Sequence, residues 1–117
     1  MQDVLLIITG ITLLISTVFV HELAHCAVAK VLGFRINSVI YSKFVLAIDI
    51  DMDNANGVEK AAIYIAGPLS DLLFTAIALY INPLLAIIPA TMFIFNASPI
   101  KKGEIKTDGY NLFTEVM

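Results

Sequence analysis

Residues 4–32 read VLLIITGITLLISTVFVHELAHCAVAKVL, a run of 29 residues that is apolar apart from a few positions, chiefly His21, Glu22 and His25. A helix needs about 20 mostly apolar residues to cross a bilayer, so this run is long enough to span one with some tilt. A secretory signal peptide is the alternative, but it would start with basic residues. This chain starts with Met1-Gln2-Asp3 and shows no convincing cleavage site, so we expect a lasting membrane helix over about residues 4–32.

The composition of the whole chain agrees with a membrane protein. Of its 117 residues, 59% are hydrophobic and 15% charged, against about 45–50% and about 25% in a soluble domain. So small a globule cannot bury this excess, because its surface is large relative to its volume. Disorder is excluded by the same numbers, a disulfide scaffold by the single Cys26, and nucleic-acid binding by the net charge of −3. We therefore expect one membrane-embedded domain over residues 1–117.

Two further apolar runs follow, at about residues 61–81 and 84–98. Asn82-Pro83 lies between them and is typical of a tight turn, which predicts a helical hairpin. Gly67-Pro68 lies inside the second run and leaves backbone groups that a neighbouring helix must satisfy. With the first run, the sequence predicts three transmembrane helices.

Residues 35–56 have a different pattern. Ile48-Asp49-Ile50-Asp51-Met52-Asp53 alternates strictly, and β-branched and aromatic residues precede it. Alternation with period two is typical of strands, so we expect a small β-hairpin, closed by the turn at residues 54–57. The fold class is thus an all-α membrane protein with a β-hairpin inserted between its first and second helices. Residues 99–117 should form a basic loop and a short helix beginning at Asp108.

The basic residues fall into two groups that three spans would place on one side of the membrane. One group flanks the loop after the first helix and the other follows the third: Lys30, Arg35, Lys43 and Lys60, then Lys101, Lys102 and Lys106. The positive-inside rule makes that side cytoplasmic. We therefore expect a multi-pass protein of a bacterial cell membrane, with its N-terminus outside and its C-terminus in the cytoplasm.

His21-Glu22-Leu23-Ala24-His25 is an H-E-x-x-H motif. On a helix, positions i and i+4 share a face, so both imidazoles can reach one metal ion, and Glu22 can act as general base toward a metal-bound water. Buried core histidines are the alternative. Ionisable side chains inside a membrane are costly and usually functional, so we expect a catalytic Zn²⁺ site with one ion per chain.

A third protein ligand is needed, and several side chains could supply it. The candidates are Asp49, Asp51, Asp53, Asp71, Glu104, Asp108 and Glu115, with Cys26 as a soft alternative. Cys26 lies on another side of the helix and is expected to be a small buried hydrophobe. The alternating aspartates are expected to form a solvated strand face, with calcium binding as the alternative. Asp108 is favoured, because Pro99 ends the preceding helix and Gly109 permits close backbone approach.

The ordered motifs resemble those of the site-2 proteases, the intramembrane zinc metallopeptidases of family M50. They are His21-Glu22-x-x-His25, Gly67-Pro68, and Asn96-x-x-Pro99 followed by Asp108-Gly109, over about residues 4–113. The resemblance implies that His21, His25 and Asp108 bind zinc, that Glu22 is the base, and that Asn96 helps to position the substrate or its scissile carbonyl.

The chain departs from the family pattern in three respects. Asp71 stands where the family often has Asn, and Lys-Lys-Gly-Glu lengthens the interval between Asn96 and Asp108. The extra helices and PDZ domains of many members are missing, which fits either a near-minimal catalytic core or a fragment of a longer protein.

The function that follows is hydrolysis of peptide bonds in membrane-spanning or membrane-associated peptides, in regulated intramembrane proteolysis or peptide-precursor maturation. The expected partners are a transmembrane or small hydrophobic peptide substrate and the lipid bilayer, with a homo-oligomer or an accessory membrane protein left open. One alternative is a catalytically silent zinc-binding membrane protein acting in binding or immunity. Another is a metal transporter, which would need more polar residues than Ser70, Asp71 and Thr75 in its second helix.

Overall fold

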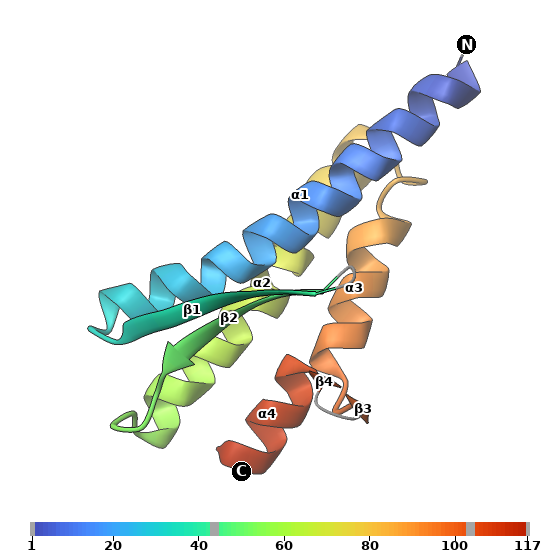
Figure 1. Ribbon diagram of the computed structural model, residues 1–117. Helices are drawn as coiled ribbons and strands as arrows, with labels where there is room; N and C mark the ends of the chain where they lie inside the picture. The colour runs from blue at the N-terminus through green and yellow to red at the C-terminus, as the bar shows by residue number, and fades with distance from the viewer. Residues whose placement is uncertain (1, 43–44, 103–104, 117) are drawn as a thin grey trace.

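The computed structural model describes residues 2–42, 45–102 and 105–116 and is mostly helical (Figure 1). Its helices are α1 (Gln2–Val31), α2 (Gly57–Ile81), α3 (Ile87–Ala97) and α4 (Asp108–Glu115). Its strands are β1 (Arg35–Ser42), β2 (Val45–Asp51), β3 (Lys101–Lys102) and β4 (Ile105–Lys106). The expected helical fold with a small hairpin between the first two long helices is confirmed.

Two helices in the described part of the chain are long and apolar enough to cross a membrane. They are α1 with 30 residues and α2 with 25, and they lie side by side in opposite directions (Figure 1). The expectation of a third such helix was wrong. Helix α3 has 11 residues, or about 16 Å at 1.5 Å per residue, about half the thickness of the hydrocarbon core.

Two prolines explain why α3 is short. Pro89 is the third residue of the helix, and a proline is tolerated in the first turn because its missing N–H would have no partner there. The helix therefore begins at Ile87, after a turn at residues 82–86, and Pro99 follows its C-terminal end.

Most buried residues of the helices are polar or small, although Ile63 is also buried, and many large aliphatic residues face outward. The buried residues of α1 recur every fourth position: Thr17, His21, His25 and Ala29. Large aliphatic side chains on the same helix are exposed, among them Leu5 at 65% and Ile7 at 61%. Small buried residues allow close helix packing in lipid, so the exterior of this fold is suited to a bilayer.

The β-hairpin packs beside the C-terminal half of α1 (Figure 1). Strands β1 and β2 are antiparallel and pair Arg35 with Asp51, with an irregularity between Ile36 and Ser38. The hairpin connection falls on residues 43–44, outside the described residues. The turn at residues 54–57 was expected to close the hairpin, but it follows β2 and leads into α2. Asn56 caps α2 there, in a reciprocal capping box with Glu59.

Helix α4 packs against α2 and the end of α3. It begins at Asp108, as expected, and Thr107 caps it by accepting a hydrogen bond from the Tyr110 backbone N–H. The preceding segment was expected to be a loop, but it contains the paired strands β3 and β4. The chain thus returns to the end of the molecule where α1 ends and α2 begins, opposite the N-terminus (Figure 1).

Candidate metal centre

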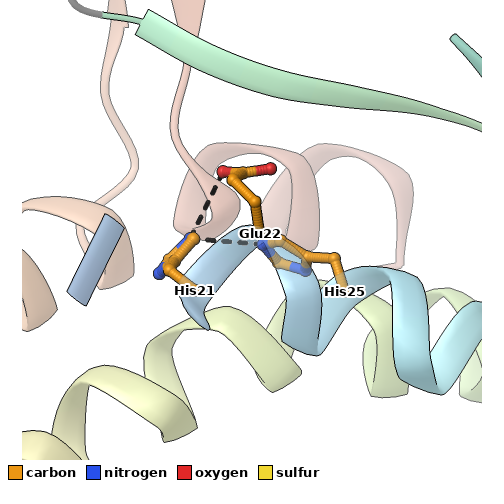
Figure 2. Close-up of side chains that lie close together, drawn as sticks. All are labelled: His21, Glu22 and His25. Atoms are coloured by element: carbon orange, nitrogen blue, oxygen red, sulfur yellow. Dashed lines mark hydrogen bonds and ion pairs between the residues drawn. The ribbon is translucent and has the colours of Figure 1, made fainter. Parts of the chain in front are cut away.

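The H-E-x-x-H motif lies in the C-terminal half of α1, and its three polar side chains gather on one side of the helix (Figure 2). His21 and His25 are 4% and 6% exposed, and their Nε2 atoms lie 3.2 Å apart. The nearer carboxylate oxygen of Glu22, Oε1, lies 4.0 Å from His21 Nε2. These three residues form a group able to hold a metal ion.

Asp108 reaches the same point from α4. Its Oδ2 lies 2.7 Å from His21 Nε2 and 3.2 Å from His25 Nε2. Asp108 is thus closer to the imidazoles than Glu22 is. Burial opposes ionisation of the Asp108 carboxyl, but hydrogen bonds with both histidines outweigh burial and lower its pKa. Two nitrogens and one carboxylate oxygen therefore converge, while the Glu22 carboxylate stands beside them.

The hydrogen-bond partners of the two Nδ1 atoms determine which tautomer each imidazole adopts. His25 Nδ1 lies 2.5 Å from the carbonyl oxygen of Ile63, which can only accept, so Nδ1 carries the hydrogen. His21 Nδ1 lies 2.9 Å from Asp71 Oδ2, which fixes the same tautomer when that carboxylate is ionised. In neutral imidazoles of this tautomer both Nε2 lone pairs point toward the Asp108 carboxylate. A metal ion between the three groups would satisfy them, as would a proton on Nε2 when no metal is bound.

The donor set fits zinc. Zinc binds imidazole nitrogen at about 2.0–2.1 Å, and in a tetrahedron that places neighbouring ligand atoms about 3.3 Å apart. The observed separations of 2.7 to 3.2 Å are hydrogen-bond distances a little shorter than this, so the ligand atoms would have to move apart by a few tenths of an ångström to hold the ion. Every ion pair found among the described residues involves a histidine rather than Lys or Arg. A divalent cation would therefore add positive charge at a centre whose carboxylates pair, among the described residues, with histidines alone.

Glycines and a helix cap bring these elements together. A Cβ on Gly67 would overlap the imidazoles of His21 and His25, so both rings lie directly on the backbone of α2. A Cβ on Gly109 would overlap the Ala97 carbonyl, so α4 begins in contact with the end of α3. Thr107 Oγ1 donates to the Ser98 carbonyl over 2.5 Å and accepts from the Ile100 N–H over 3.0 Å. These contacts hold Asp108 at the histidines.

A cavity of about 220 Å³ opens beside the centre, between β2, α2 and α4. Residues of the centre that line it are Glu22, His25 and Asp108. The β2 side of the cavity is formed by Ile48, Asp49 and Ile50, and Tyr64 lines it from α2. The cavity therefore leaves open space next to Glu22 that is large enough for several water molecules.

The structure places the remaining candidate residues elsewhere. Asp71 lies behind His21, on the ring nitrogen that faces away from the centre. Asn96, expected to position the substrate, donates its amide N–H to Asp71 Oδ2 over 3.2 Å. Asp51 and Asp53 are exposed, and Glu115 accepts a hydrogen bond from the Tyr64 hydroxyl. Cys26 is half-buried outside the centre, and Glu104 lies outside the described residues.

Sequence reasoning missed two residues that support the site. Thr107 is 4% exposed and ties the segment before α4 to its surroundings. A threonine before Asp-Gly is a common helix start and could have indicated this role. Tyr64 joins α2 to α4 through Glu115. No local pattern indicated that contact, because its partners are 51 residues apart.

Comparisons with protein-family models, curated proteins and solved structures found no match to this chain. The resemblance to the site-2 proteases therefore rests on the order and spacing of the motifs around His21, Gly67 and Asp108 alone.

Proposed function

We propose that this protein is an intramembrane zinc metalloprotease resembling the site-2 proteases. The observation that carries the proposal is the convergence of His21, His25 and Asp108 beside Glu22, on a long apolar helix. A structural metal site would close its coordination with a fourth protein ligand, whereas three ligands beside a cavity leave a position for water. A carboxylate next to that position is suited to proton transfer.

In this proposal His21, His25 and Asp108 hold one Zn²⁺, with the two imidazoles kept as Nδ1–H tautomers by Asp71 and the Ile63 carbonyl. Bound zinc would polarise the scissile carbonyl and lower the pKa of a water molecule. Glu22 accepts the proton of the attacking water and then delivers it to the leaving amine. The cavity under β2 admits the peptide, which must be extended there for its carbonyl to be reached.

The substrate class follows from the surroundings of the cavity. A peptide that reaches Glu22 approaches a centre enclosed by α1, α2 and α4 and bordered by exposed aliphatic side chains. A single membrane-spanning segment or a small hydrophobic peptide suits this path. Water enters from the end where α4 and the hairpin lie, and we place that end in the cytoplasm because three lysines lie on β3 and β4.

The test is metal analysis of the purified full-length protein in detergent, with cleavage of a panel of single-span peptides. We expect about one zinc per chain and cleavage that Glu22→Gln abolishes while zinc stays bound. Loss of the general base should slow turnover by about 10²- to 10⁴-fold. Wild-type turnover in Glu22→Gln would exclude the mechanism. Bound zinc without cleavage of any peptide would favour a silent zinc-binding protein.

Orientation is tested separately by labelling from each side of the membrane. With Cys26 replaced by Ala, single cysteines at positions 2 and 101 should react from opposite sides, and position 101 from the cytoplasm. Although α3 alone is too short to span, it carries the chain back toward the end that holds α4 (Figure 1). Labelling of both positions from one side would contradict this topology.

A further inference from the structure

Asp71 is the most deeply buried carboxylate of the described chain, at 0% exposed. It lies on α2, one helical turn after Gly67, the glycine on which the two imidazoles rest. Its Oδ2 is 2.9 Å from His21 Nδ1. An ionised carboxylate is rarely buried without partners, because removing it from water costs several kcal/mol or more. The position of Asp71 therefore needs an explanation beyond packing.

The partners of Asp71 are few. Its Oδ2 receives the Asn96 amide N–H over 3.2 Å, in addition to the contact with His21. Its Oδ1 has no hydrogen-bond partner among the described residues. Among the described residues, Asp71 forms an ion pair with His21 and with no other side chain. The charge of Asp71 thus acts through the ring of His21, toward the point where the Nε2 atoms converge.

The two histidines of the centre differ in this respect. His25 Nδ1 donates to a neutral backbone carbonyl, that of Ile63, whereas His21 Nδ1 faces a carboxylate. A carboxylate behind a metal-bound imidazole fixes its tautomer and orientation and makes the ring a more basic ligand. Asn96 on α3 in turn orients the carboxylate, so three helices contribute to the placement of one ring.

We propose that Asp71 is a positioning residue of this metal centre, which holds His21 as the Nδ1–H tautomer and strengthens its bond to the metal through its negative charge. The inference depends on the proposed zinc site but not on proteolysis. It also assigns Asn96 to orienting Asp71 rather than to contact with the substrate.

The experiment measures zinc affinity of the purified full chain in detergent, by competition with a chromophoric chelator. Asp71→Ala removes both acceptor and charge, and should weaken zinc binding by about 10- to 100-fold. Asp71→Asn keeps an oxygen that can accept from Nδ1 and should weaken it less. Ser70→Ala is the matched control, because Ser70 is also buried on α2 and, among the described residues, its hydroxyl donates within its own helix, to the Gly67 carbonyl.

A second readout separates positioning from general stability. In zinc-loaded protein with ¹⁵N-labelled histidine, the His21 Nδ1–H proton should resonate downfield and exchange slowly with water, because it is hydrogen-bonded to the buried Asp71 carboxylate. Slow exchange should persist in Asp71→Asn and Ser70→Ala and should be lost in Asp71→Ala. Circular dichroism and gel filtration check that each variant is folded.

Wild-type affinity in Asp71→Ala, or an equal loss in Ser70→Ala, would overturn the inference. If Asp71→Ala does not fold, Asp71→Asn decides, and an affinity equal to the wild type's then contradicts the inference. If the wild type binds no zinc, the inference and the proposed function fail together. If it binds zinc but cleaves no peptide, the proposed function fails while the zinc affinities still test the role of Asp71.

Discussion

The two halves of α1 have similar apolar composition but opposite surroundings. In residues 2–16 no side chain is buried, and aliphatic residues such as Leu5 and Ile7 face outward. In residues 17–31 every fourth residue is buried, and three of those four, Thr17, His21 and His25, are polar. The polar half is the half that has buried side chains.

This contrast shows how a fold suited to lipid reverses the usual rule for cores. In water, apolar side chains are buried, whereas in a bilayer the aliphatic ones gain nothing by leaving lipid. Polar groups gain by meeting one another, because each unsatisfied group in hydrocarbon costs several kcal/mol. The second half of α1 is therefore held by His21, His25 and their partners on α2 and α4.

The largest expected effect comes from removing the two histidines that distinguish the second half of α1 from the first. His21→Ala or His25→Ala should abolish stoichiometric zinc binding and all cleavage, because two protein ligands are too few for a stable catalytic site. Leu23→Ala is the control, since Leu23 lies between them and is 55% exposed. Zinc content by atomic emission is the measurement. One zinc per chain in either histidine variant would remove that residue from the ligand set.

Asp108 is the next largest test, because it joins the polar half of α1 to α4. Asp108→Ala should lower zinc affinity and cleavage together, since it removes the proposed charged ligand, whose carboxylate lies 2.7 Å from His21 Nε2. Glu104→Ala, in the segment before α4, should leave both nearly unchanged. The opposite pattern of zinc content would transfer the ligand role to Glu104 and contradict the motif alignment.

How much the sequence could predict depended on how local each feature is. The H-E-x-x-H spacing alone places His21 and His25 on one helix face, and Pro99 and Gly109 indicated why Asp108 can approach them. The contact between His21 and Asp71 spans 50 residues. It depends on how α2 is rotated about its axis against α1, which no local pattern specifies.

The error over the third span has a different origin. Residues 84–98 are apolar enough to suggest a membrane helix, but composition does not determine where a helix begins. Pro89 restricts the start of α3 to the preceding turn. Similarly, the run Asn54 to Gly57 predicts a turn that closes the hairpin, whereas Asn56 and Glu59 form a capping box at the start of α2, a pattern that the sequence also contains.

A pair of glycine substitutions sharpens the comparison between the halves of α1. Gly67→Ala should place its Cβ in the space of both imidazoles, and such overpacking typically costs about 1–3 kcal/mol. In Gly10→Ala the new Cβ meets, among the described residues, Ile88 Cδ1 at 3.4 Å, and alanine favours a helix. We expect the thermal midpoint in detergent and the zinc affinity to fall for Gly67→Ala, and neither to fall for Gly10→Ala. Equal tolerance at both positions would mean that the rings do not rest on α2.

The smallest expected effect concerns Thr107, which acts on the centre only through the start of α4. Its hydroxyl caps that helix and binds the Ser98 carbonyl and the Ile100 N–H. Loss of such a cap costs about 0.5–2 kcal/mol. If the loss of the cap makes the position of Asp108 beside the histidines less stable by about 1 kcal/mol, Thr107→Ala should weaken zinc binding by about fivefold, since 1.4 kcal/mol corresponds to about tenfold.

Thr107→Ser keeps the hydroxyl and should restore the affinity, which separates the loss of hydrogen bonds from a change in packing. Glu22 does not contact α4 by any hydrogen bond found among the described residues, so cleavage at saturating zinc should change little in either variant. A loss of cleavage at full zinc occupancy would show instead that Thr107 shapes the cavity. The start of α4 would then control the path of the peptide rather than the position of Asp108.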